Sequence, residues 1–281
     1  MYSLKDIYKD VQTQLRSITP AYYFETDLII TKALKIKRSD LYANPDKILT
    51  PSQVRTVNYY LTERLTYKPL PYIFCEREFY GLNFYVDENI FIPRQETEFV
   101  VEESLDLIKN NKLKVCADIG TGCGNIAISI VKNIPFYIKM YATDISSDAL
   151  KVAKKNADRL NVLDKIEFVL SDKLKYFIKN EILLDIIISN PPYITEQEYE
   201  KLQPEIYYEP KLALVSNNGI EFYEHFATYA KKILNKDGFI VVEINHNLAD
   251  EILKIFHNAN YKVVKTIKDY QNLPRVMVVK N

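Results

Sequence analysis

The residues best suited to chemistry in this 281-residue chain form a tetrapeptide, Asn190-Pro191-Pro192-Tyr193. Proline fixes φ and lacks an N–H, so two successive prolines stiffen the backbone and leave the Pro191 carbonyl free to accept hydrogen bonds. With the side-chain oxygen of Asn190, it offers two acceptors to the two hydrogens of a planar amino group. Tyr193 adds an aromatic face that can stack on this group and stabilise positive charge on its nitrogen. The tetrapeptide therefore predicts a site for a planar –NH2 group, and a rigid turn with a packed tyrosine is the alternative.

Glycine marks a second candidate site. The chain has only six glycines, and three of them, Gly120, Gly122 and Gly124, fall within five residues. This cluster indicates unusual backbone torsion angles or the close approach of a ligand. Thr121 and Cys123 complete the segment, which we call the glycine loop, and Cys123 is interpreted as a small residue that fits a tight turn.

Both sites depend on the elements that carry them. From about residue 114 onward, short β-branched runs alternate with amphipathic helical patterns. This alternation predicts an α/β fold with a mostly parallel, doubly wound sheet and helices on both faces. The predicted strands are 114–119, 139–143, 165–170, 184–189, 239–244, 261–267 and 275–279. The predicted helices of this region are 97–109, 125–132, 147–160, 219–234 and 248–258.

Polar residues follow the first four of these strands. Asp118 and the glycine loop come after the first, Asp144 after the second, Asp172 after the third and the tetrapeptide after the fourth. The carboxyl ends of parallel strands share one edge of a sheet, and ligands bind there. A single carboxylate would more often be a helix cap. Four such strand ends together predict a binding site.

The glycine loop leaves two classes of ligand open. Residues 122–127 fit the G-x-G-x-x-A dinucleotide pattern, with Asp144 twenty residues beyond Gly124, so a dehydrogenase is one alternative. Asp118 argues against it, because a pyrophosphate would be brought close to a carboxylate at reduced dielectric. S-adenosylmethionine is cationic and tolerates that carboxylate. Its ribose hydroxyls can donate to Asp144 and its adenine amino group to Asp172.

A helical segment precedes the sheet. Apolar residues recur at helical spacing from about residue 4 to residue 67, and Thr50-Pro51 matches an N-cap followed by proline at the first helical position. The alternating segment 78–93 suggests a short hairpin. We expect a helical N-terminal domain over residues 1–74, a linker with the hairpin over 75–94 and a second domain over 95–281.

Composition limits the classes of function. Thirty-seven basic and 37 acidic side chains balance, and residues 1–74 are net +4, which leaves −4 for the rest and argues against affinity based on phosphate neutralisation. No apolar run is long enough to span a bilayer, and the first residues lack a signal or transit pattern, so we expect a cytoplasmic protein. Three cysteines without C-x-x-C spacing and three scattered histidines predict neither a disulfide framework nor a metal site.

At the tetrapeptide the chain resembles the class I methyltransferases that modify planar amino nitrogens, which carry (D/N/S)-P-P-(Y/F/W) after the fourth strand. Further segments are similar to one group of these, the glutamine N(5)-methyltransferases of peptide chain release factors (the PrmC or HemK family). These segments are residues 68–73, 79–84, 91–98, which read F-I-P-R-Q-E-T-E against the group's I-P-R-x-E-T-E, and 209–214. The resemblance extends from about residue 68 to the C-terminus.

This resemblance implies a Rossmann-like class I methyltransferase sheet of seven strands behind a small helical domain that recognises the substrate. It implies that the glycine loop and Asp118 hold the methionine part of S-adenosylmethionine, Asp144 the ribose, and Asp172 with the Lys173 backbone the adenine. Lys173 stands where some members have an aromatic residue. Asn245, Asn272 and Cys75 stand where glycines are expected.

The resemblance also implies that the tetrapeptide binds the substrate glutamine, with Asn190 next to the cofactor. Arg94 and Glu96, in the stretch similar to I-P-R-x-E-T-E, would border the substrate. The alternative for this stretch is a simple helix start, in which Thr97 caps the helix and Glu98 favours its first turn.

The function that follows is methyl transfer from S-adenosylmethionine to the side-chain amide nitrogen of the glutamine in the Gly-Gly-Gln loop of class I release factors, with S-adenosylhomocysteine as product. One alternative is methylation of a nucleic-acid amino group, guanine-N2 in rRNA or adenine-N6 in DNA. The −4 charge of the catalytic part and the absence of a long insertion disfavour it. A second alternative, a non-catalytic nucleotide-sensing interaction protein, leaves the tetrapeptide unexplained. We expect no stable DNA binding, no membrane association and no metal.

Overall fold

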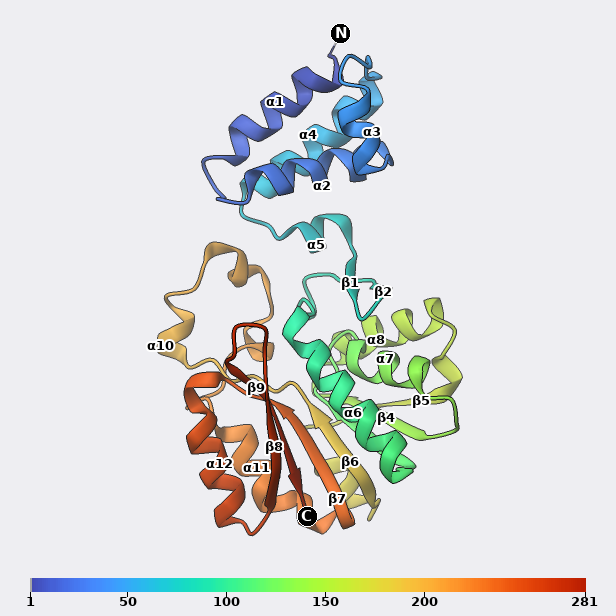
Figure 1. Ribbon diagram of the computed structural model, residues 1–281, viewed down its shortest axis with the longest axis vertical. Coiled ribbons are helices and arrows are strands. Elements are labelled where there is room, and N and C mark those ends of the chain that lie inside the picture. Colours follow the sequence, from blue (N-terminus) through green and yellow to red (C-terminus); the bar gives the residue numbers. More distant parts are fainter. Residues whose placement is uncertain (1) are drawn as a thin grey trace. The chain divides into compact units, whose positions relative to one another are not determined.

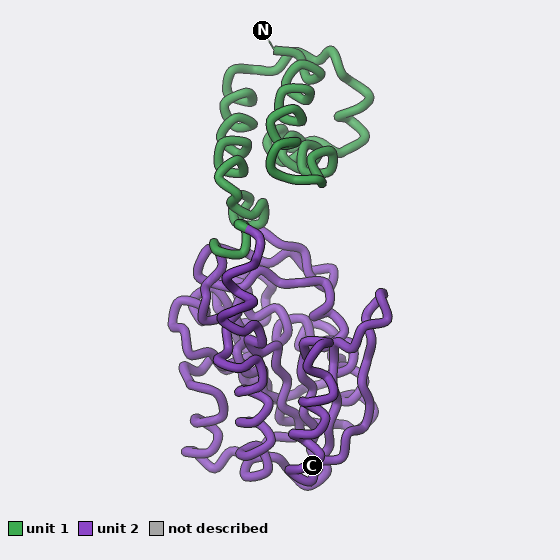
Figure 2. Tube along the Cα trace, turned by 90° about the vertical axis from the view of Figure 1, so that its left-hand side faces the viewer, with its two compact units in different colours: residues 1–75, 204–208 green, residues 76–203, 209–281 purple. Residues whose placement is uncertain are grey.

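The computed structural model describes residues 2–281, which form two compact units (Figures 1 and 2). Unit 1 contains the chain up to Cys75 and a later segment, Pro204–Tyr208, whereas unit 2 contains Glu76–Gln203 and Glu209–Asn281. Among the helices of the described residues, none has both the length and the hydrophobicity that a membrane span requires.

Unit 1 is a small bundle of amphipathic helices. In its first helix, side chains three or four positions apart, such as Leu4, Ile7 and Val11, are buried against the other helices. Thr50 caps the fourth helix by accepting from the Gln53 amide, with proline at the first helical turn, so the predicted N-cap is confirmed. The helices are α1 (Leu4–Leu15), α2 (Tyr22–Leu34), α3 (Arg38–Ala43), α4 (Pro51–Leu65) and α5 (Leu70–Phe74).

The segment Pro204–Tyr208, a short 3₁₀ helix (η3), belongs to unit 1 although it follows in sequence most of the sheet. Arg64 is buried and donates to Glu25 (Nε to Oε2, 2.7 Å) and to Glu205 (Nη2 to Oε1, 2.9 Å). The Tyr208 hydroxyl donates to the Thr66 carbonyl oxygen at 2.8 Å. Because a buried guanidinium requires carboxylate partners, Glu205 fixes this late segment among the helices. No sequence pattern predicted that Pro204–Tyr208 belongs to unit 1.

Unit 2 contains a seven-stranded sheet in the order β5-β4-β3-β6-β7-β9-β8, in which only β9 runs antiparallel to its neighbours. The predicted seven-stranded, mostly parallel sheet is confirmed. The short hairpin before it pairs β1 (Arg77–Phe79) with β2 (Leu82–Phe84). The sheet strands are β3 (Val115–Ile119), β4 (Lys139–Asp144), β5 (Ile166–Leu170), β6 (Leu184–Ser189), β7 (Leu234–Glu243), β8 (Lys262–Lys268) and β9 (Pro274–Lys280).

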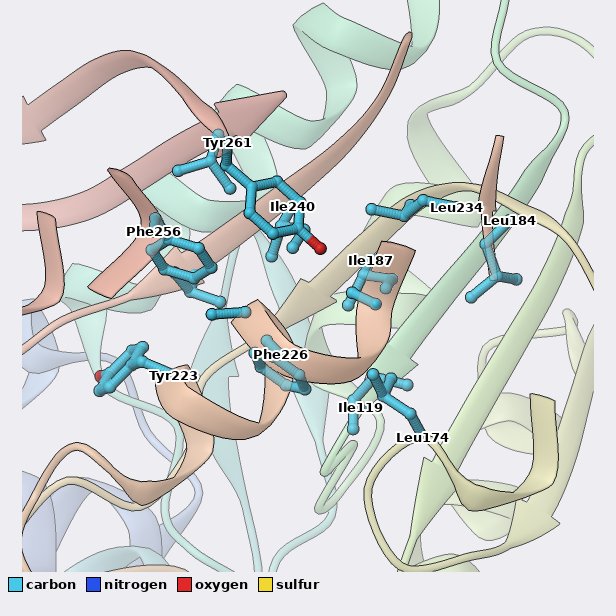
Figure 3. Packing of buried hydrophobic residues seen from close by; sticks show 14 of the residues in the cluster. Ile119, Leu174, Leu184, Ile187, Tyr223, Phe226, Leu234, Ile240, Phe256 and Tyr261 are labelled. Carbon is cyan, nitrogen blue, oxygen red and sulfur yellow. The ribbon is translucent and has the colours of Figure 1, made fainter. Parts of the chain in front are cut away.

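Helices cover both faces of this sheet (Figure 1), because alternate residues of its central strands point to opposite sides and both sets are apolar. Figure 3 shows the packing on one face, where Ile187 and Ile240 of the strands meet Phe226 and Phe256 of the helices. The helices of this face are α9 (Lys175–Lys179), α11 (Glu221–Tyr229) and α12 (Ala249–Asn258). Those of the other are α6 (Glu98–Asn111), α7 (Asn125–Asn133) and α8 (Ser147–Arg159).

One predicted boundary is wrong. A helix was expected over 219–234, but α11 ends at Tyr229, a 3₁₀ turn follows, and β7 already begins at Leu234. Leu234 pairs in parallel with Leu184, and a bulge with Asp237 at φ 68° separates this pair from the regular register. The strand starts early because its neighbour β6 offers backbone partners, which the local helical pattern does not reveal.

Replacing Phe226 by alanine should lower the free energy of unfolding by about 3–5 kcal/mol, because it leaves a cavity in a fully buried aromatic cluster. Urea unfolding followed by circular dichroism measures the change. Tyr137, 76% exposed, is the matched control, and its replacement by alanine should change stability by less than about 0.5 kcal/mol. Equal effects of the two substitutions would contradict the assignment of this core.

Candidate active site

The sheet order places the four predicted strand ends at one edge. β5, β4, β3 and β6 are consecutive parallel neighbours, so the segments that follow them lie side by side. These segments contain Asp172, Asp144, the glycine loop and the tetrapeptide, in that order across the sheet. The structure therefore brings together the residues that were singled out from the sequence.

The three glycines of the loop all have left-handed backbone torsion angles, with φ of +73° at Gly120, +53° at Gly122 and +83° at Gly124. A Cβ added at Gly120 or Gly122 would meet no atom within 4 Å, so these two positions border open space. At Gly124 it would lie 2.9 Å from Ile128 Cδ1 and 3.3 Å from Ala153 Cβ. Gly124 thus lets α7 pack closely against α8, whereas Gly120 and Gly122 leave room for a ligand.

Asp118 stabilises the glycine loop through a hydrogen bond that it accepts from Thr121. Its side chain is fully buried, and Oδ2 accepts from the Thr121 hydroxyl (2.7 Å) and the Ala127 amide (3.2 Å). Oδ1 has no hydrogen-bond partner among residues 2–281. Burial raises the pKa of Asp118 to about 7. The unsatisfied oxygen of this buried carboxyl fits a cationic ligand better than a pyrophosphate.

Asp144 ends β4 and faces the same loop. Its Oδ2 accepts from the Gly122 amide and its Oδ1 from the Ser146 amide, both at 2.9 Å. Burial raises the pKa of Asp144 above its ordinary value. Cys123 lies buried in the loop, and burial raises the pKa of its thiol to about 12, so it stays protonated. Cys123 is therefore suited to packing rather than to nucleophilic chemistry.

Beyond β5, Asp172 forms an ion pair with Lys175 at 2.6 Å. Lys173 has φ of 49°, and its Nζ lies 2.5 Å from Glu221 Oε1 and 4.7 Å from the ring centroid of Phe222. The Lys173 side chain is thus held by Glu221 and Phe222, the first two residues of α11. Cys75 and Asn272, where glycines were expected, also have positive φ, 54° and 64°. Their backbones adopt the conformation that glycine favours.

The tetrapeptide is connected to two residues outside it. Asn190 Nδ2 donates to Thr97 Oγ1 (3.1 Å), and Thr97 Oγ1 donates to Glu243 Oε2 (2.6 Å). The Tyr193 hydroxyl donates to Glu243 Oε1 (3.1 Å). Within residues 2–281, neither Asn190 Oδ1 nor the Pro191 carbonyl accepts a hydrogen bond. The two predicted acceptors therefore have unused hydrogen-bonding capacity.

Sequence reasoning missed the part that Thr97 and Glu243 play. The alternative in which Thr97 caps a helix with its side chain is wrong, because α6 has no side-chain cap and the Thr97 hydroxyl donates to Glu243, 146 positions away. Glu243 is 2% exposed at the last position of β7. A single carboxylate at the end of an apolar strand was the available signal.

Arg94 and Glu96 lie in different environments. Arg94 donates to Glu209 Oε1 and to the Ile92 carbonyl (2.9 Å), while Glu209 Oε2 accepts from the Ile92 amide (3.0 Å). Glu209 is buried, and the Arg94 guanidinium lies 4.4 Å from the ring centroid of Phe91. Two of the segments that resemble the family are thus joined by an ion pair whose carboxylate is buried. Glu96 is exposed.

Among the described residues, no group of three His, Cys, Asp or Glu side chains is arranged to hold a metal ion. The site contains a glycine loop next to a buried carboxyl, a second carboxyl one strand away, and, beside a tyrosine, two acceptors without hydrogen-bond partners in the described part of the chain. These groups suit an organic cofactor and a planar amino group.

Comparison with known proteins agrees with this arrangement. A family model described as the methyltransferase small domain matches residues 97–271, and one described as the PrmC N-terminal domain matches residues 6–74. In overall structure, a ribosomal protein L11 methylase from Lactobacillus delbrueckii subsp. bulgaricus matches with a TM-score of 0.50 at 18% identity, over 68% of this chain and 80% of that one. The fold and the site thus define a class I methyltransferase.

Comparison with curated relatives shows which family of methyltransferases the chain belongs to. A release factor glutamine methyltransferase from Chlorobaculum tepidum is 35% identical over 89% of this chain and 87% of its own length. A protein of the same name from Clostridium acetobutylicum is 33% identical over 98% and 97%. The chain belongs to the release factor glutamine methyltransferase family, which confirms the resemblance seen at the tetrapeptide.

Replacing Asp118 by asparagine should stabilise the protein relative to the wild type as the pH rises. The folded wild type keeps the Asp118 proton up to about pH 7, whereas the unfolded chain releases it near 3.8, so folding loses free energy between these values. Asparagine has no proton to release. Urea midpoints of both proteins from about pH 4 to pH 7 should therefore diverge in favour of the variant.

Asp237→Asn is the control, because Asp237 pairs with Lys280 at 2.8 Å and this lowers its pKa. The stability difference between that variant and the wild type should stay nearly constant from about pH 5 to pH 7, because Asp237 is ionised in both the folded and the unfolded wild type in this range. A pH-independent difference between Asp118→Asn and the wild type would show that Asp118 is ionised without cost.

Proposed function

We propose that this protein transfers a methyl group from S-adenosylmethionine to the side-chain amide nitrogen of the glutamine in the Gly-Gly-Gln loop of class I peptide chain release factors, leaving S-adenosylhomocysteine. The observation that carries the proposal is the position of the tetrapeptide. It follows β6, the direct neighbour of the strand that carries the glycine loop, in a chain similar to release factor glutamine methyltransferases over nearly its whole length.

The residues at the edge suit this cofactor. Gly120 and Gly122, which border open space, would hold the methionine part above the Asp118 carboxyl. Asp144 would accept from the ribose hydroxyls, and Asp172 with the Lys173 backbone would meet the adenine. When bound, S-adenosylmethionine supplies an electrophilic methyl carbon on a positively charged sulfur.

The tetrapeptide prepares the amide nitrogen of the substrate. An amide nitrogen is a poor nucleophile, because its lone pair is delocalised into the carbonyl. Asn190 Oδ1 and the Pro191 carbonyl would each accept one N–H, which fixes the plane of the amide and returns electron density to nitrogen. Pro192 keeps this corner rigid, and the Tyr193 ring would stack on the amide. The substrate nitrogen loses its proton only after the new bond forms, so no strong base is required.

Other parts of the proposal rest on position and charge. Arg94, fixed by buried Glu209, and exposed Glu96 would border the glutamine-bearing loop. The protein would act in the cytoplasm, where release factors work, without a metal and without stable DNA binding. Methylation of a nucleic-acid amino group is the second candidate, because the tetrapeptide alone permits it.

Replacing Asn190 by alanine should reduce turnover on the order of 10²-fold or more, the effect of losing an oriented polar group in an active site. The affinity for S-adenosylmethionine, measured by calorimetry, should stay within a few-fold of the wild type. Asn110→Ala, at an exposed position near the end of α6, serves as a control. Turnover close to that of the wild type would remove Asn190 from the mechanism.

The choice between acceptors is tested with the purified protein and methyl-labelled S-adenosylmethionine. A release factor, the same factor with its Gly-Gly-Gln glutamine replaced by alanine, duplex DNA and ribosomal RNA are offered separately. Label should appear on the unmodified release factor alone. Label on DNA or RNA, or equal label on the altered factor, would overturn the proposal.

A further inference from the structure

The hydrogen bonds that run from Asn190 to Glu243 decide which end of the Asn190 amide faces the ligand. The oxygen and the –NH2 group of an asparagine have nearly the same shape, so packing alone does not distinguish the two orientations. An acceptor for a substrate N–H is present only when Oδ1 points outward. With the amide reversed, the same position would present a donor.

The buried Glu243 carboxylate determines the direction of each hydrogen bond in the series from Asn190 through Thr97 to Glu243. An ionised carboxylate can only accept, so Thr97 must direct its single hydrogen to Glu243 Oε2, 2.6 Å away. The Thr97 oxygen can then only accept from Asn190, and it does so from Nδ2 at 3.1 Å. The Asn190 oxygen is consequently left on the other side of the amide.

Glu243 also holds the other functional side chain of the tetrapeptide. Its second oxygen, Oε1, accepts from the Tyr193 hydroxyl at 3.1 Å, which limits rotation of the tyrosine ring. Its backbone carbonyl accepts from the Tyr223 hydroxyl of α11 at 2.8 Å, which ties the end of β7 to the packed core. One buried carboxylate thus orients an amide and an aromatic ring together.

We propose that Thr97 and Glu243 are positioning residues, which fix the Asn190 amide with its oxygen toward the substrate –NH2 group and hold the Tyr193 ring beside it. The proposal rests on the function assigned above. It adds two residues, from η1 (Gln95–Thr97) and β7, that neither touch the reacting atoms nor belong to the tetrapeptide.

The charge state of Glu243 controls this arrangement. The groups that face its carboxyl are Tyr193 and Thr97, which donate to it, Arg275 of β9, which favours its ionised form, and Glu96 of η1, which disfavours it. Burial outweighs these contributions and raises the pKa of Glu243 to about 6. A protonated Glu243 can donate to Thr97. The Thr97 hydroxyl can then donate to Asn190, so the orientation of the Asn190 amide is no longer determined. The amide should therefore be held correctly only above about pH 6.

The first test compares Thr97→Val with Thr97→Ser. Valine keeps the shape of threonine and removes the hydroxyl, whereas serine keeps the hydroxyl. Thr97→Val should lower kcat about tenfold, with the affinity for S-adenosylmethionine and the melting temperature little changed, and Thr97→Ser should recover most of the loss. Equal kcat values for the two variants, or a loss in Thr97→Val that follows a lower melting temperature, would overturn the proposal.

The second test does not depend on activity. In ¹⁵N-labelled protein, the side-chain –NH2 resonance of Asn190, assigned with the Asn190→Asp variant, should shift with pH around 6 in the wild type. The shift should vanish in Glu243→Gln, where the titrating group is absent. A wild-type resonance that is independent of pH, or one that titrates unchanged in Glu243→Gln, would contradict the role of Glu243.

The pH profile links the two tests. Wild-type kcat should fall as the pH drops through about 6, and Glu243→Gln should be slow at every pH without this transition. Failure of the proposed function is recognised separately, because wild-type protein would then leave the release factor unlabelled. The Thr97 comparison is in that case made on whichever acceptor is labelled, since the orientation of Asn190 matters for any planar amino group.

Discussion

Carboxyl groups near the carboxyl ends of three parallel strands set the geometry of the functional edge. Asp118 in β3 accepts from the Thr121 hydroxyl of the glycine loop, Asp144 at the end of β4 accepts from the Gly122 amide, and Glu243 at the end of β7 accepts from Thr97. The carboxyl oxygens named here accept the hydrogen bonds of these partners, and their positions therefore set the directions of those bonds. The loop and the tetrapeptide derive their shape from this constraint.

Such an edge suits a reaction that depends on placement. Burial raises the pKa of Asp118 and of Glu243, because removing the ionised carboxylates from water costs free energy. What the protein gains is a set of acceptors that does not have to reorganise when a substrate amide arrives. A weak nucleophile beside a methyl donor needs this kind of preorganisation more than it needs a strong base.

Segments far apart in sequence are secured in the same manner. Glu209 is fixed by Arg94 and the Ile92 amide, and Glu205, four residues earlier, is bound by buried Arg64 in unit 1. The stretch that follows the tetrapeptide is thus fixed by one ion pair within η3 and by a second at Glu209, the residue directly after it. Glu205 belongs to unit 1 and Glu209 to unit 2.

The sequence alone determined the sheet, its strands to within a few residues, the capped helix at Thr50 and the strand ends where Asp144 and the tetrapeptide lie. These features follow from local periodicity and from the rule that parallel strands share a carboxyl edge. Only the tertiary structure decided the early start of β7, the return of Pro204–Tyr208 to unit 1 and the bond from Thr97 to Glu243. Each of these depends on a partner that is distant in the chain, and a local pattern does not specify which distant donor meets which acceptor.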